Sequence, residues 1–209
     1  MEDLKDEAYI CRLADGVGMR KYDLFLVAGL TVPDSALAFD KASQRELPQL
    51  VRLALSLSTS SRRQLRDFVQ SVNDLPMDSH SRDVPAFESY PPGFGSLLVR
   101  MLGLRNLGWS SAAKVMYLMS GVHLSAATIG AVGRGAKELD AEILSGFSAV
   151  LGIPIETLSV MTGVQRAVER CKTSERNADV AALLWDIRHF AAGQVQEAVR
   201  RANELKEGV

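Results

Sequence analysis

Cysteine is the residue type that this sequence most clearly lacks. Its 209 residues include only Cys11 and Cys171, which lie far apart and form no CxxC pair. A disulfide framework and a thiolate zinc site both need several cysteines at characteristic spacings, so both are excluded. We expect two reduced and partly buried thiols.

Motifs for catalysis and metal binding are also missing. The three histidines, His80, His123 and His189, do not stand at metal-ligand spacing with cysteine or carboxylate residues. The sequence contains no phosphate-binding loop, no GxSxG and no HExxH. We therefore expect a protein that is not an enzyme and that holds no metal ion and no cofactor.

An excess of charge of one sign is absent as well. The 24 basic side chains are balanced by 25 acidic ones, and the isoelectric point is about 6.3. Proteins that coat nucleic acid nonspecifically carry a broad basic surface, so the charge balance disfavours that class. A specific regulator that concentrates a few Lys and Arg residues on one face is compatible with it.

Long apolar runs do not occur. No run reaches the roughly 18 residues that a membrane-spanning helix needs. Residues 1–12 (MEDLKDEAYICR) are acidic and lack the apolar core of a signal peptide. The sequence therefore predicts a cytoplasmic protein without a membrane partner.

The hydrophobic residues that are present favour helices. Aromatic residues make up only 6% of the chain, whereas hydrophobic residues reach 47% and are rich in Ala, Leu and Val. This mixture is typical of helical rather than sheet proteins. The predicted fold class is all-α.

Prolines mark the clearest boundary along the chain. Residues 75–95 hold four of the seven prolines, with Ser, Asp and Gly between them. Because proline lacks a backbone donor and restricts the residue before it, helix is disfavoured here. We expect an interdomain linker over 75–95, a first module over 1–74, a second module over 96–164 and a C-terminal helical segment over 165–209.

The two sides of this linker resemble each other at an offset of 92 positions. The offset pairs Gly29 with Gly121 and gives several other identities, namely Gly16/Gly108, Leu26/Leu118, Glu46/Glu138, Leu47/Leu139 and Ser56/Ser148. The match indicates a duplicated module.

The C-terminal segment predicts one long amphipathic helix. Apolar residues from Val180 to Leu205 follow a three-four spacing, and Asn177 is placed to cap a helix over Ala178–Leu205. Such an apolar stripe needs a cover. Either its own domain or a second subunit provides one, which makes this segment a candidate for dimerisation.

The second module shows the most informative local pattern. Apolar spacing and capping residues predict four further helices around a turn at Gly121, over Leu97–Leu107, Ala112–Met119, Asp140–Leu151 and Ile155–Met161. A short central helix follows Ser125 and ends at Val132. Gly121 permits the positive φ of a tight corner, with Val122 buried beneath it.

This order, carried by Ser110–Leu158, resembles the lambda-repressor-like (XRE-type) helix-turn-helix domain. The resemblance implies two such bundles plus the C-terminal helix, and a sequence-specific DNA-binding transcriptional regulator. It also implies a homodimer, since such modules gain affinity from two half-sites on double-stranded DNA.

The resemblance also implies the contact residues. In the family, bases are met mainly from the start and exposed face of the third helix, which here carries His123, Ser125, Ala126, Ala127 and Gly130. Phosphates would be contacted by Ser110, Ser111, Lys114, Arg134 and Lys137.

One departure leaves two interpretations open. The exposed face of the third helix carries Ser, Ala and Gly, so the bidentate side chains that discriminate bases are missing. Either a small surface lets the helix lie deep in the groove, or the module has become an adaptor that binds another regulator.

The first module departs further. Its central helix is expected over Pro33–Asp40, where Asp34 and Asp40 would face phosphates. Like-charge repulsion therefore favours a structural or dimerising role. Basic side chains follow at Arg62, Arg63 and Arg66, either as a solvated helix face or as contacts to a DNA backbone.

Overall fold

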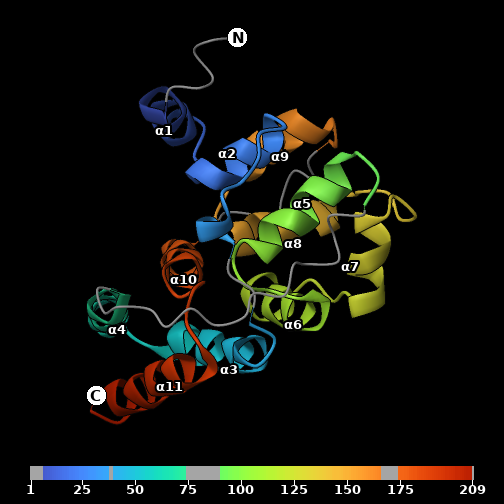
Figure 1. Cartoon of the computed structure of the whole chain (residues 1–209). Coiled ribbons are helices and arrows are strands. Elements are labelled where there is room, and N and C mark those ends of the chain that lie inside the picture. Colours follow the sequence, from blue (N-terminus) through green and yellow to red (C-terminus); the bar gives the residue numbers. More distant parts are fainter. Residues whose placement is uncertain (1–6, 38–39, 74–89, 166–173, 209) are drawn as a thin grey trace.

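The fold was analysed in a computed structural model, which describes residues 7–37, 40–73, 90–165 and 174–208. Within these residues the chain forms eleven α-helices, one 3-10 turn and no β-strand (Figure 1). The all-α prediction is confirmed. No helix in this described part of the chain has the length and apolarity required to traverse a membrane.

Five helices build the central bundle. They are α5 (Phe94–Gly103), α6 (Trp109–Ser120), α7 (Ala126–Gly133), α8 (Ala141–Leu151) and α9 (Ile155–Thr162). Helix α5 packs against α7 and α8, α6 packs against the same two helices, and α9 packs against α8. The number and order of helices expected over the second module are therefore correct.

Local capping explains several helix boundaries in this bundle. Gly121 ends α6 with a φ of 74°, and Gly152 ends α8 with a φ of 68°. Ser125 Oγ accepts a hydrogen bond from the Thr128 amide at 3.0 Å and thereby caps α7. Val122 is buried beside this corner, as the sequence predicts. A left-handed residue satisfies terminal carbonyls at little steric cost only when it is glycine, which is why the sequence reveals these turns.

Helix α6 begins earlier than expected. Its N-cap is Gly108, and neither Ser110 nor Ser111 caps it. Ser111 is buried and its hydroxyl donates to the Gly108 carbonyl at 3.0 Å. The extra residues bring Trp109 into the first turn of α6.

The N-terminal helices pack onto the central bundle. Helix α1 (Glu7–Gly16) packs against α2 (Lys21–Val27), and α2 packs against α5. Thr157 Oγ1 of α9 donates to the Val17 carbonyl at 3.1 Å, so the loop between α1 and α2 is tied to α9.

The expected central helix of the first module is not formed as an α-helix. Over Pro33–Asp40 the structure has a 3-10 turn, Asp34–Ala36, and residues 38–39 lie outside the described part. A helical turn is costly to nucleate. Of the residues of this turn whose burial the structure describes, only Ala36 is buried. The two halves related by the sequence offset thus differ at this helix.

The C-terminal segment is two helices, which corrects the prediction of a single helix over Ala178–Leu205. Helix α10 (Glu175–Asp186) begins after its N-cap Ser174, not at Asn177. The chain then turns with Ile187 and Phe190 buried, and α11 (Ala192–Glu207) begins anew. Gln194 Oε1 accepts the Ala191 amide at 2.9 Å, which stabilises this restart. The three-four spacing continues through the break, so periodicity alone could not reveal it.

The apolar stripe of this segment is covered within the chain. Helix α10 packs against α3 (Ser43–Ser56), α4 (Thr59–Asn73) and α8, and α11 packs against α3 and α4. The stripe residues Val180, Leu184, Val195, Ala198 and Ala202 are all buried. This face is therefore not available for dimerisation.

One core connects the segments. Buried side chains from Met19 to Ala202 belong to a single hydrophobic cluster, and α3 packs against both α6 and α11. Residues of the expected first module, second module and C-terminal segment therefore share one interior. Most of the expected linker, residues 75–89, lies outside the described part.

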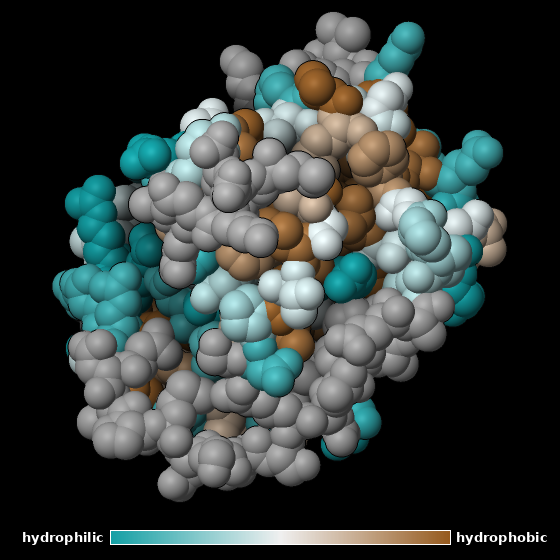
Figure 2. Space-filling model, turned by 45° about the horizontal axis from the view of Figure 1, so that its top comes forward, coloured by the Kyte–Doolittle hydropathy of each residue, from teal (hydrophilic) through white to brown (hydrophobic). Residues whose placement is uncertain are grey.

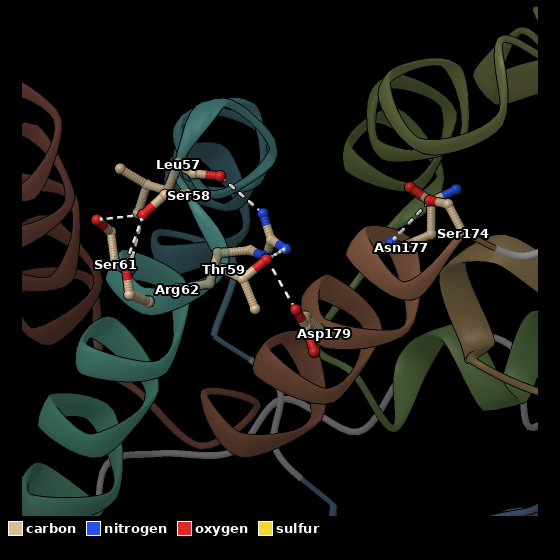
Figure 3. A network of polar contacts seen from close by, with 9 residues as sticks. Leu57, Ser58, Thr59, Ser61, Arg62, Ser174, Asn177 and Asp179 are labelled. Carbon is tan, nitrogen blue, oxygen red and sulfur yellow. Dashed lines mark hydrogen bonds and ion pairs between the residues drawn. The ribbon is translucent and has the colours of Figure 1, made fainter. Parts of the chain in front are cut away.

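Ion pairs join α4 to α10, as Figure 3 shows for Arg62. Arg62 Nε donates to Asp179 at 2.9 Å, and its other nitrogens donate to the Leu57 carbonyl and to Thr59. Arg66 donates to Asp186 at 2.6 Å. Both arginines are thus engaged in packing α4 on α10, which differs from the solvated and the DNA-contacting roles considered from the sequence.

A buried ion pair lies where the N-terminal helices meet the bundle. Arg105 and Asp23 are both 0% exposed, and two guanidinium nitrogens donate to the two carboxylate oxygens at 2.9 and 2.7 Å. Arg105 also donates to the Met101 carbonyl at 2.9 Å and to the Leu151 carbonyl at 2.6 Å. One side chain therefore joins α2, the end of α5 and the end of α8.

We predict that Arg105→Met lowers the free energy of unfolding by about 3–5 kcal/mol, because it leaves the Asp23 carboxylate buried without its partner. Urea denaturation followed by circular dichroism measures this change.

Adding Asp23→Leu to Arg105→Met removes the stranded charge, so the double variant should regain most of the lost stability. A double variant no more stable than Arg105→Met would contradict the assignment of that cost to an uncompensated charge.

Candidate nucleic-acid interface

The corner between α6 and α7 carries most of the side chains that the sequence singles out. Of the residues expected to meet bases, His123, Ser125 and Ala127 are exposed and Ala126 is half-buried. The His123 ring lies edge-on to Tyr117, with centroids 5.7 Å apart. The exposed start of α7 thus offers an imidazole, a hydroxyl and methyl groups.

Gly130 does not belong to this exposed face, which corrects the prediction. It is buried, and a Cβ placed on it would lie 2.9 Å from Cζ3 of Trp109. The absence of a side chain is therefore needed for the approach of α7 to α6, and not for an approach to DNA.

Trp109 organises the opposite end of α7. The Arg134 guanidinium lies 5.4 Å from the centroid of the Trp109 ring, and the Tyr90 ring is stacked on the same indole at 6.5 Å. Gly133 lies against Tyr90, where a Cβ would be 2.6 Å from Cε2. Partial burial raises the pKa of the Tyr90 hydroxyl. Two glycines on one face of α7 thus accommodate two aromatic rings, and Arg134 covers the indole.

The start of α6 lies beside Arg134 because Trp109 is the first residue of that helix. Ser110 and Lys114 are exposed there, whereas Ser111 is buried. No side chain hydrogen bond caps the N-terminus of α6 at Gly108, unlike the N-termini of α7, α8 and α10. Free backbone amides and a guanidinium are therefore brought together at this point.

Lys137 is placed differently from the other basic candidates. It is exposed and lies 3.5 Å from Asp140, the N-cap of α8. An exposed pair of this length contributes little to stability and releases the lysine readily to a competing anion.

Sequence reasoning missed Trp109 and Tyr90. A usable signal existed for Trp109, since a tryptophan directly before Ser110-Ser111 is a large aromatic at a helix start. Tyr90 stood within the expected linker, where an aromatic side chain can pin the linker to a neighbour, but nothing in the sequence indicated that its partner would be Trp109.

A second surface feature is a groove bordered by the start of α5 and by the ends of α7 and α9. Its lining includes apolar side chains from before and within α5, from α7, and from the segments after α7 and α9, namely Pro91, Pro92, Phe94, Val132, Leu139 and Val164. Phe94 is 45% exposed and Val160 of α9 is 86% exposed. Figure 2 shows apolar side chains gathered on the face that corresponds to the top of Figure 1, where α5 and α9 lie.

The described residues contain no group of three or more His, Cys, Asp or Glu side chains that could hold a metal ion. Cys11 is partly buried and carries a free thiol, and Cys171 lies outside the described part. Comparison with protein-family models, with curated proteins and with solved structures finds no match to this chain. The function is therefore inferred from the chemistry of the surface itself.

We predict that Gly130→Ala destabilises the fold by about 1–2 kcal/mol. The new methyl group would overlap the Trp109 ring, and overpacking of this kind outweighs the roughly 1 kcal/mol that alanine gains in helix propensity. Thermal or urea unfolding measures the difference, and tryptophan fluorescence reports the displaced indole.

Gly193→Ala in α11 is the matched control, because no atom lies within 4 Å of the position a Cβ would take there. This variant should be neutral or stabilised by up to about 1 kcal/mol. Equal behaviour of the two alanine variants would argue against close packing of Gly130 on Trp109.

Proposed function

We propose that this protein is a sequence-specific DNA-binding transcriptional regulator that contacts DNA through the α6–α7 corner. The observation that carries the proposal is the position of Arg134, which stacks on Trp109 and thereby stands beside the uncapped start of α6. The XRE-type resemblance of Ser110–Leu158 supports the same assignment. The helix order of α5 to α9 is compatible with it.

The chemistry of this corner suits a phosphate group. A helix N-terminus presents unpaired amides and a partial positive charge, and a guanidinium adds planar donors in a fork. Stacking on the indole restricts the arginine side chain before binding, so less conformational entropy is lost when a phosphate is contacted. Lys114 on α6 and Lys137 after α7 extend the basic surface.

The bases would then be met by the start of α7. Ser125, Ala126, Ala127 and His123 present a small surface that allows the helix to approach the floor of the major groove closely. Alanine methyl groups there would contact thymine methyl groups, and His123 would provide a hydrogen-bonding edge. This set implies a modest number of base-specific contacts, with affinity dominated by phosphates.

A homodimer on two half-sites is part of the proposal, since one short helix reads few base pairs. The interface would differ from the one expected from the sequence, because the apolar stripe of α10 and α11 is buried by α3, α4 and α8. The groove that contains Phe94 and Val132 offers an alternative apolar surface.

Fluorescence anisotropy with duplex fragments, including the promoter of its own gene, tests the proposal at two or more salt concentrations. We expect saturable binding that weakens with salt. Arg134→Ala/Lys137→Ala should abolish specific binding at moderate salt. Removing one phosphate-binding side chain should make the dependence of log affinity on log salt shallower by about 0.9.

The matched control is Arg52→Ala/Lys206→Ala, which removes the same charge from exposed positions on α3 and α11. These helices lie away from α7 in Figure 1. The control should bind like the unmodified protein. Absence of binding at low salt, or an equal reduction of affinity in both double variants, would overturn the assignment of this corner.

The second candidate function is an adaptor that binds another regulatory protein. The groove that Phe94, Val132 and Leu139 help to line favours it, because an exposed apolar patch on a monomer often marks an interaction site. It becomes the better explanation when the protein binds no duplex at low salt while the fold is intact.

A further inference from the structure

A group of arginines surrounds one tryptophan on the side of the molecule away from α7. The guanidinium carbons of Arg188, Arg105 and Arg20 lie 4.3, 5.2 and 5.8 Å from the centroid of the Trp185 ring. The Tyr22 ring lies beside the same indole, with centroids 6.5 Å apart. The group joins the start of α2, the end of α5 and the end of α10, and we call it the Trp185 cluster.

The carboxylates near this cluster already have partners. Asp23 is held by Arg105 in the buried bidentate pair, and Asp186 accepts a hydrogen bond from Arg66 at 2.6 Å. Electrostatic interactions at this point involve four arginines, namely Arg20, Arg66, Arg105 and Arg188. The aspartates that take part are the same two, Asp23 and Asp186. Within the described residues, positive charges therefore exceed negative ones at this point.

Some donors of the cluster are buried without a partner. Among the described residues, Nε of Arg105 and Nε of Arg188 are buried and make no hydrogen bond. Arg188 donates through Nη1 to the Trp185 carbonyl at 2.8 Å, which orients its guanidinium over the ring. Arg20 and Arg188 are only partly buried, so solvent and small solutes reach them. An unsatisfied buried donor is costly, and because the Arg188 side chain is only partly buried, an anion held beside it could accept from its Nε and remove that cost.

The directions in which the pKa values of these groups are shifted agree with this geometry. Desolvation by burial, together with the positive charge of Arg105, lowers the pKa of Arg20. Desolvation is also the largest cause that lowers the pKa of Arg188, with Arg105 and Arg20 adding to it. Both guanidinium groups thus carry a positive charge in surroundings that disfavour it. A negatively charged ligand would offset the desolvation and the repulsion between the arginines.

We infer that the Trp185 cluster is a binding site for a phosphate group, with Arg20 and Arg188 as its principal ligands. Guanidinium groups pair with phosphate through parallel hydrogen bonds, and their fixed planes on the indole pre-orient them for this contact. Because arginines cover the indole, the site recognises the anionic group rather than an aromatic ring stacked on Trp185. The ligand class is inorganic phosphate or a small phosphomonoester.

This site is independent of the proposed DNA contact. It lies at α2 and α10, whereas the corner with Arg134 lies at α7, across the molecule in Figure 1. A titration without DNA tests it, so its success or failure does not depend on whether the protein binds a duplex.

Isothermal titration calorimetry of the full chain, with sodium phosphate added at constant ionic strength against sodium chloride, is the direct experiment. We expect saturable binding with one phosphate per chain. Arg20→Gln/Arg188→Gln should weaken it at least tenfold, and Arg20→Lys/Arg188→Lys should weaken it several-fold, because lysine keeps the charge and loses the planar fork.

Arg52→Gln/Arg176→Gln is the matched control, since both arginines are exposed and stand outside the cluster. It should bind phosphate like the unmodified chain. A second readout is the emission of Trp185 in a Trp109→Phe background, which should change with phosphate and saturate at the same concentration. Saturation that persists unchanged in the Arg20→Gln/Arg188→Gln chain, or no saturable signal in either readout, would overturn the inference.

Glycerol 3-phosphate in place of inorganic phosphate distinguishes the source of the ligand. Tighter binding of the ester would identify a phosphorylated metabolite as the ligand class, and equal binding would identify the inorganic anion. The thermal midpoint should rise with either ligand in the unmodified chain, because a ligand that binds only the folded state stabilises it. The midpoint should stay constant in Arg20→Gln/Arg188→Gln.

Discussion

The structure depends on the buried pair of Arg105 and Asp23. Arg105 follows α5, Asp23 belongs to α2, and the same guanidinium donates to the carbonyl at the end of α8. A charged group that is buried away from solvent must keep its hydrogen-bonding partners in a defined arrangement. This pair therefore fixes how the N-terminal helices pack on the bundle. The indole of Trp185 then brings α10 to the same guanidinium. The consequence reaches the surface, because Arg20 and Arg188 are oriented around that indole as well.

Both tryptophans of this chain lie against arginine side chains, and the two sites differ in their surroundings. Arg134 covers Trp109 at an exposed corner beside a helix start, which suits an extended polyanion that arrives from solvent. Around Trp185 several arginines are partly or fully buried, which suits a small anion. The same pair of residue types thus suits two different kinds of ligand, and the distinction lies in burial and in the number of guanidinium groups.

The sequence predicted those features that depend on neighbouring residues. Gly121 and Ser125 define a turn and a cap through local geometry, and both lie where they were expected. Asp140, expected as the first residue of a helix, is the N-cap of α8. Features that depend on distant residues were not predictable. The buried position of Gly130 requires Trp109 to lie across it, the break between α10 and α11 keeps the apolar periodicity intact, and Arg62 and Arg66 have partners more than 100 positions away. Most residues named from the sequence are therefore exposed at or near the α6–α7 corner, while the aromatic residues that support the corner were missed.

The packing of α3 against α11 has a consequence for how the protein folds during its synthesis on the ribosome. Helix α3 is synthesised early, and its apolar face is covered by α11, which is made last among the described helices. Helices α6 and α10 cover other parts of α3 earlier, but the part that packs against α11 has no permanent cover until α11 is synthesised. Long-range closure of this kind slows folding and favours transient association with chaperones. The order in which the helices appear is therefore itself a constraint on how this protein reaches its folded state.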